Sequence, residues 1–187
     1  MASRQRTQAT ILLSGGLDSI ACAHFLQQRG MWVRGLFIDH GQAAARREVA
    51  ASTALAAHLA IPLEACTLSN SHPLGAGELL GRNAMLIFNA LFLTQGKSDL
   101  LALGLHAGVP YFDCSKTFVT SAGNLVGELT DGRVSLVAPF IAWTKKDVFD
   151  YFLTAGLPLA LTYSCESGTD PVCGTCASCR DRKALGC

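Results

Sequence analysis

A short glycine-rich loop is the first candidate for chemistry. The apolar stretch Ala9–Leu13 runs into Ser14-Gly15-Gly16-Leu17-Asp18-Ser19, and a helix is expected to follow at once. The glycines let an anion approach the main chain, and the N–H groups and macrodipole of a helix N-terminus favour a phosphate. Ser14 and Ser19 add hydroxyl donors, and Asp18 either caps the helix or holds Mg²⁺. The alternative is an ordinary strand-to-helix turn. The loop lacks the spacing and the lysine of a Walker A motif, so we predict a phosphate site of another type.

Four cysteines near the C-terminus form the second candidate site. Cys165, Cys173, Cys176 and Cys179 offer four thiolates, which suffice for a closed tetrahedral zinc site with no open position for catalysis. Cys176 and Cys179 can both project inward if a helix begins at this point. A redox Cys-x-x-Cys and paired disulfides are the alternatives. We predict a structural zinc ion that fixes a tail at about residues 160–187.

The elements that position these residues alternate between strand and helix. Strands are expected at 9–13, 31–38, 63–68, 100–104 and 134–137, and helices at about 19–28, 43–60, 83–94, 116–128 and 144–156. This pattern predicts an α/β fold, a doubly wound parallel sheet with helices on both faces, in a single domain over residues 1–187. A ligand should bind at the carboxyl ends of the strands, where the Ser14 loop, Asp39-His40-Gly41 and the residues after Gly104 lie.

Periodicity also suggests which side chains face inward. The helix at 83–94 carries an apolar stripe, and the helix that begins after the cap residue Thr144 should bury four side chains. The stripe consists of Met85, Phe88 and Phe92, and the four buried side chains are Val148, Phe149, Phe152 and Leu153. Cys22 is expected in the core and Cys66 in a strand.

Composition narrows the class of protein. The chain has 187 residues, half of them hydrophobic and 16% charged, with a formal net charge of +1, which predicts a globular protein. No polybasic run or membrane-length apolar run is visible, so we expect neither a nucleic-acid partner nor a membrane. We predict a cytoplasmic location, where the eight cysteines point to metal or catalysis before disulfides.

The two candidate sites together resemble a known family. The Ser14–Ser19 loop resembles the pyrophosphate loop of the ATP pyrophosphatase (PP-loop) superfamily, whose members cleave ATP between the α and β phosphates. With the four cysteines added, the chain is similar to the 7-cyano-7-deazaguanine synthase (QueC-like) family. Further matching segments are Phe37–Gln42, Gly81-Arg82-Asn83, Asp113-Cys114 followed by Phe118, Pro139 with Lys145, and Tyr163-Ser164-Cys165. Two segments depart from the family: the stretch between Leu68 and Gly81 is shorter, and Gly104–Cys114 loses two residues and an acidic group.

The resemblance implies an ATP-dependent ligase. Such an enzyme adenylates 7-carboxy-7-deazaguanine, uses ammonia to form 7-cyano-7-deazaguanine, and releases AMP and pyrophosphate. Its cofactors would be ATP, Mg²⁺ and the structural Zn²⁺. The catalytic residues implied are Asp18, Arg82 and Lys145, and Lys146 is expected to be plain surface. The nucleotide would be held by Ser14, Gly15, Gly16, Leu17, Asp18, Ser19, Asp39, Arg82 and Asn83.

The implied substrate pocket contains His106, Asp113 and Cys114. His106 would line the base pocket, Asp113 would bind an exocyclic amine, and Cys114 would be either a wall residue or a nucleophile. Two alternatives stay open: a variant ligase that joins the activated deazaguanine acid to another amine, including a protein amine, and a zinc-stabilised binding module with a vestigial nucleotide loop. The sequence leaves open whether the chain forms a homodimer.

Overall fold

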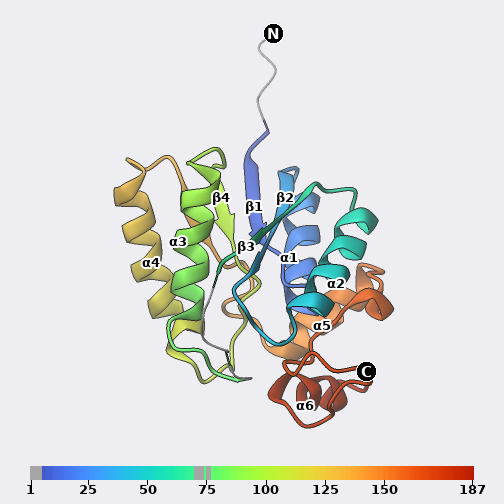
Figure 1. Cartoon of the computed structure of the whole chain (residues 1–187). Helices are drawn as coiled ribbons and strands as arrows, with labels where there is room; N and C mark the ends of the chain where they lie inside the picture. The colour runs from blue at the N-terminus through green and yellow to red at the C-terminus, as the bar shows by residue number, and fades with distance from the viewer. Residues whose placement is uncertain (1–5, 70–73, 75–76) are drawn as a thin grey trace.

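A parallel sheet of five strands forms the centre of the molecule (Figure 1). The computed structural model describes residues 6–69, 74 and 77–187, with strands β1 (Gln8–Leu12), β2 (Trp32–Asp39), β3 (Leu63–Thr67), β4 (Leu100–Ala102) and β5 (Ser135–Val137). Their order is β3-β2-β1-β4-β5, and every neighbouring pair is parallel. The winding therefore reverses between β1 and β4, and in open α/β sheets ligands bind at the carboxyl ends of the strands at such a position.

Helices cover both faces of the sheet. They are α1 (Leu17–Gln28), α2 (Ala45–His58), α3 (Arg82–Thr94), α4 (Lys116–Leu129), α5 (Lys145–Thr154) and α6 (Ala177–Ala184). Helices α1, α2 and α5 pack in one apolar cluster with β1, while α3 and α4 pack in a second cluster on the opposite face (Figure 1). Two single 3-10 turns, η1 (Phe112–Cys114) and η2 (Leu159–Leu161), join longer elements. The predicted doubly wound α/β fold is confirmed.

The buried sides of the helices were only partly predicted. Cys22, Val148, Phe149 and Phe152 are buried as expected, and Thr144 caps α5 in a capping box with Asp147. The expectation for Leu153 was wrong, because this side chain is 52% exposed. The Met85–Phe88–Phe92 stripe was predicted only in part: Phe88 packs against the second apolar cluster, but Phe92 is 70% exposed. The fully buried residues of α3 are Asn83, Ile87, Ala90 and Thr94.

Gly104 lets the segment after β4 lie against the first turn of α1. A Cβ at Gly104 would lie 2.6 Å from the carbonyl oxygen of Asp18 and 2.8 Å from the amide nitrogen of Ser19. A side chain at this position would therefore push the end of β4 away from the first turn of α1. In the part of the chain that the structure describes, no helix is both long enough and apolar enough to span a bilayer.

Candidate functional site

The phosphate loop is organised by the Ser19 hydroxyl. The Ser14 N–H and the Ser14 hydroxyl both lie 3.2 Å from Ser19 Oγ, which donates to the Gly16 carbonyl over 3.0 Å. Gly16 is the N-cap of α1 and has no side chain to cap the helix, so the N–H groups of the first turn are open to an anion. Asp18 does not cap the helix: its carboxylate is held by a residue far along the chain.

The two glycines of the loop have different roles. Gly15 has a φ of +75°, and a Cβ there would lie 2.6 Å from the Glu48 carbonyl oxygen of α2. Gly16 has an ordinary extended backbone with φ −85°, and the nearest neighbour of its Cβ would lie 3.5 Å away. Gly16 therefore needs no unusual backbone angle. The absence of a side chain at Gly16 matters for the approach of an anion to the main chain of the loop.

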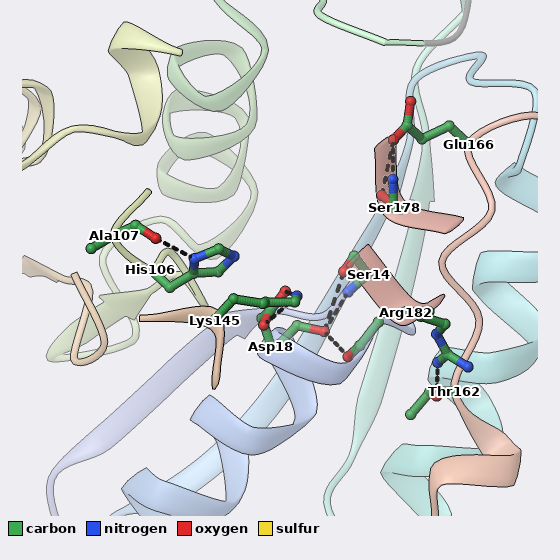
Figure 2. A network of polar contacts seen from close by, with 11 residues as sticks. Ser14, Asp18, His106, Ala107, Lys145, Thr162, Glu166, Ser178 and Arg182 are labelled. Atoms are coloured by element: carbon green, nitrogen blue, oxygen red, sulfur yellow. Dashed lines mark hydrogen bonds and ion pairs between the residues drawn. The ribbon is translucent and has the colours of Figure 1, made fainter. Parts of the chain in front are cut away.

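Lys145, the first residue of α5, forms an ion pair with Asp18 in the first turn of α1 (Figure 2). Its Nζ lies 2.8 Å and 2.6 Å from the two carboxylate oxygens, and about a quarter of each side chain is exposed. The capping box of Thr144 and Asp147 starts α5 at Lys145 and so fixes the backbone that carries the ammonium group. Lys146, in contrast, is an exposed residue that pairs with Asp150, as expected.

His106 lies on the loop that follows β4. Its Nδ1 is 2.7 Å from the Ala107 carbonyl oxygen, so Nδ1 is the donor of this hydrogen bond (Figure 2). The Ala107 N–H donates to the Trp143 carbonyl over 2.7 Å, so the loop is tied to the segment that leads into Lys145. The structure thus brings His106 to the same edge of the sheet as the Asp18–Lys145 pair.

A second group of charges follows the end of β2. Asp39 Oδ1 accepts a hydrogen bond from the Gly41 N–H over 2.9 Å, and Arg82 begins α3. Glu48 of α2 accepts a 2.8 Å hydrogen bond from Gln42. Burial holds the pKa of Glu48 above its ordinary value. The Gln42 hydrogen bond and the charge of Arg82 oppose this effect without cancelling it. The sequence analysis did not single out Glu48 as a member of this group. The only signal was its spacing of six residues from Gln42, which lies just after the end of β2.

Asn83, Asp113 and Cys114 form one connected group. Asp113 Oδ2 accepts from the Asn83 N–H over 3.0 Å, and the Asn83 side-chain amide donates to the Asp113 carbonyl over 2.9 Å and to Cys114 Sγ over 3.4 Å. Burial and the Asp113 charge raise the pKa of the Cys114 thiol, which favours a wall residue over a nucleophile. Asn83 is buried and places the turn η1 against the first turn of α3.

The four cysteines of the tail converge on one point. The Sγ atoms of Cys165, Cys173, Cys176 and Cys179 all lie within 4.8 Å of one another. Tetrahedral zinc with Zn–S bonds of about 2.3 Å requires sulfur–sulfur edges of about 3.8 Å. The Cys173 and Cys179 sulfurs are 3.9 Å apart. The donor set therefore fits zinc, and α6 begins at Ala177, directly after its N-cap residue Cys176.

Backbone N–H groups stabilise negative charge on two of the four sulfurs. The Cys176 N–H donates to Cys173 Sγ over 3.4 Å, and the Cys173 N–H donates to Cys165 Sγ over 3.3 Å. Hydrogen bonds from the backbone at Thr175 and Cys176 lower the pKa of Cys173 to about 5. A thiolate at neutral pH is the form that binds a metal ion.

The shortened stretch between Leu68 and Gly81 lies partly outside the described residues. Of its positions, 70–73, 75 and 76 fall outside them.

Comparison with known proteins identifies the family of the chain. The model of the family described as "Queuosine biosynthesis protein QueC" matches residues 8–83 and 79–185. The 7-cyano-7-deazaguanine synthase of Synechococcus sp. (strain CC9902) is 34% identical, with 95% of this chain and 91% of that protein covered. The synthase of Methanoculleus marisnigri is 28% identical, with 94% and 92% covered.

Solved structures support the fold at low sequence identity. NMN synthetase from Francisella tularensis aligns with a TM-score of 0.63 at 16% identity and covers 97% of this chain and 78% of that one. A predicted subunit of tRNA methyltransferase from Methanocaldococcus jannaschii aligns with a TM-score of 0.52 at 15% identity, with 77% and 73% covered. Family match, curated relatives and site geometry lead to one conclusion: the chain belongs to the QueC family.

Proposed function

We propose that this chain is an ATP-dependent carbon–nitrogen ligase that converts 7-carboxy-7-deazaguanine and ammonia into 7-cyano-7-deazaguanine, with release of AMP and pyrophosphate. The observation that carries the proposal is the Asp18–Lys145 pair beside an uncapped phosphate loop, at the position where the sheet reverses its winding. The names of the relatives supply the product, 7-cyano-7-deazaguanine, and the acid is the substrate that we assign to it. We place the reaction in the cytoplasm.

The first step requires charge stabilisation rather than a nucleophilic side chain. A carboxylate oxygen of the substrate attacks the α-phosphorus, and the bond to the bridging oxygen of pyrophosphate breaks. In our proposal the Ser14–Ser19 backbone and hydroxyls hold the departing pyrophosphate, while Lys145 and Arg82 neutralise charge at the α-phosphate. Mg²⁺, when bound, would screen the phosphate charges, and Asp18 is the carboxylate we assign to hold it.

The later steps consume the acyl adenylate. Ammonia attacks the carbonyl carbon, AMP leaves, and the amine gives up a proton to form the amide. A second ATP adenylates the amide oxygen and releases a second pyrophosphate, and loss of AMP and of the two N–H protons forms the nitrile. We assign the nucleotide to the region of Asp39, Arg82 and Asn83. His106 and Asp113 are our candidates for contacts with the deazaguanine ring, and Cys114 for a wall of its pocket.

We assign the zinc a structural role. Four protein sulfurs complete a tetrahedral shell, so no position remains for a substrate or a water molecule. Its ligands would be Cys165, Cys173, Cys176 and Cys179.

Product analysis tests the function directly. The purified chain is incubated with ATP, Mg²⁺ and 7-carboxy-7-deazaguanine, with and without ammonia, and every product is identified by mass spectrometry. The Lys145→Met variant serves as the matched inactive control. Nitrile, AMP and pyrophosphate are the expected products. ADP and phosphate as main products would overturn the proposal, and a reaction that stops at the amide or joins the acid to a protein amine would establish the variant ligase instead.

A further inference from the structure

The cysteine tail is in direct contact with the phosphate loop. The Tyr163 N–H donates to the Gly15 carbonyl over 2.9 Å, just before the first cysteine of the cluster. Gly168 packs so closely on the Ala43 carbonyl, at the start of α2, that a Cβ would not fit. Arg47 of α2 pairs with Asp170 over 2.7 Å. The tail therefore lies against both elements that enclose Gly15.

Arg182 of α6 supports the residue next to this contact. Its guanidinium donates to Thr162 Oγ1, and Thr162 Oγ1 in turn donates to the Leu159 carbonyl over 2.7 Å (Figure 2). Arg182 Nε is buried and has no hydrogen-bond partner among the described residues. Since Thr162 directly precedes Tyr163, a continuous path runs from α6 through Thr162 and Tyr163 to Gly15.

Few side chains besides the cysteines hold α6 in place: its C-cap residue Leu185 packs, partly buried, against the core. The helix has eight residues with a single buried side chain, that of the ligand Cys179, and isolated helices of this length are unstable. Its start is fixed by Cys176 at the N-cap and by Glu166, whose carboxylate accepts from the Ser178 N–H over 3.0 Å and from the Ser178 hydroxyl over 2.9 Å. The position of the Arg182 guanidinium therefore depends on the metal that joins Cys176 and Cys179 to the other two cysteines.

We infer that metal binding at the cysteine cluster and pyrophosphate binding at the Ser14–Ser19 loop are energetically coupled, and that Arg182 is the positioning residue that carries the coupling. The inference rests on the proposed role of the loop. Bound metal fixes α6, Arg182 fixes Thr162, and the Tyr163 N–H then holds the Gly15 carbonyl in the anion-binding arrangement. Because Gly15 also abuts α2, the loop is held from both sides only when the tail is in place.

Calorimetric titration of the zinc-loaded full chain with pyrophosphate tests the coupling. Arg182→Ala and Thr162→Val should each weaken pyrophosphate binding about fivefold or more at unchanged zinc content, the lower range of couplings between sites. Arg180→Ala is the matched control, because Arg180 is an exposed residue of the same helix. Thr162→Ser keeps the hydroxyl and should bind as tightly as the unchanged chain. Removing the zinc should weaken binding in the unchanged chain much more than in Arg182→Ala.

The outcomes separate this inference from the proposed function. If the zinc-loaded unchanged chain fails to bind pyrophosphate, the proposed role of the loop is wrong and the inference falls with it. If it binds but Thr162→Val binds equally well, the coupling is refuted while the proposed function stands. Should Arg182→Ala lose its zinc, Thr162→Val decides, because it removes the acceptor of Arg182, together with the hydrogen bond to the Leu159 carbonyl, and leaves Arg182 and the cysteines unchanged.

Discussion

The ammonium group of Lys145 bridges both carboxylate oxygens of Asp18, at 2.6 Å and 2.8 Å, although 127 positions separate the two residues. The pair joins the first turn of α1 to the first residue of α5. It thereby sets a cation and an anion side by side at the edge of the phosphate loop. We expect it to rearrange when nucleotide binds, since Lys145 has three donors and a phosphate offers a second anion for them.

Lys145→Met should lower kcat/KM for ATP by about 100-fold, because removal of one preorganised electrostatic contact has an effect of this order. The melting temperature should change little, since a partly exposed ion pair contributes only about 1 kcal/mol or less. Steady-state kinetics and thermal unfolding measure the two effects. The control is Lys146→Met, which removes a more exposed neighbouring ammonium. Equal losses in both variants would contradict the role of Lys145.

Gly15→Ala and Gly16→Ala should fail in different ways. At Gly15 a φ of +75° costs a residue with a Cβ about 1–2 kcal/mol, and the contact with the Glu48 carbonyl adds to this, so denaturant unfolding should reveal a clear loss of stability. Gly16→Ala should leave the free energy of unfolding nearly unchanged but weaken pyrophosphate binding, because the added methyl group lies at the N-terminus of α1. A Gly16 variant that unfolds while Gly15→Ala stays stable would contradict this assignment.

The fold was predictable because its signals are local. The apolar runs at 9–13 and 31–38, the Thr144 cap and the helix start after Cys176 each depend on residues close in sequence. Which face of a helix is buried depends on its neighbours in space. Phe92 and Leu153 lie outward although their periodicity predicted that they face inward, because the packing of α3 and α5 decides the orientation.

The candidate site was predictable in its residue types but not in its connections. Ser14–Ser19 and the four cysteines are compact motifs, whereas the Asp18–Lys145 pair joins distant segments. The sequence could not tell that Gly15, rather than Gly16, needs a positive φ, because that follows from the approach of α2. Glu48 escaped notice because a single glutamate in an alanine-rich helix resembles any exposed charge.

Metal analysis should find about one Zn²⁺ per chain in freshly reduced protein. Cys176→Ser should lose most of this zinc, and α6 should then lose its protection from hydrogen exchange, because metal binding supplies folding energy to the tail. Cys187→Ser is the control, since Cys187 is exposed and lies outside the cluster. Full zinc content and full protection in Cys176→Ser would show that the ligand set is wrong.

His40 should make stability depend on pH. Burial lowers its pKa from the ordinary 6.5, the nearby Arg82 acts in the same direction, and the Ile38 carbonyl and Asp39 oppose it. The unfolded chain therefore binds a proton before the folded one does, and stability falls as pH drops below about 6.5. Compared with His40→Gln, the unchanged chain should lose up to about 1.4 kcal/mol more per pH unit in this range. If the free energy of unfolding changes by the same amount between pH 7.5 and pH 5.5 in both chains, the prediction is wrong.

Asp113→Asn separates two roles that one carboxylate can have. Oδ2 accepts from the Asn83 N–H, and an amide oxygen can accept the same hydrogen bond, so the turn against α3 should persist and the melting temperature should stay within a few degrees. The second carboxylate oxygen is our candidate acceptor for the exocyclic amine of the deazaguanine. Its replacement by an NH₂ group sets a donor against a donor, and KM for the deazaguanine acid should rise at least about tenfold while KM for ATP stays unchanged. Asp113→Ala loses both contacts and should also lose about 1–3 kcal/mol of stability, since it leaves the buried Asn83 short of a partner. An Asp113→Asn enzyme with an unchanged KM for the acid would limit Asp113 to its structural contact with Asn83.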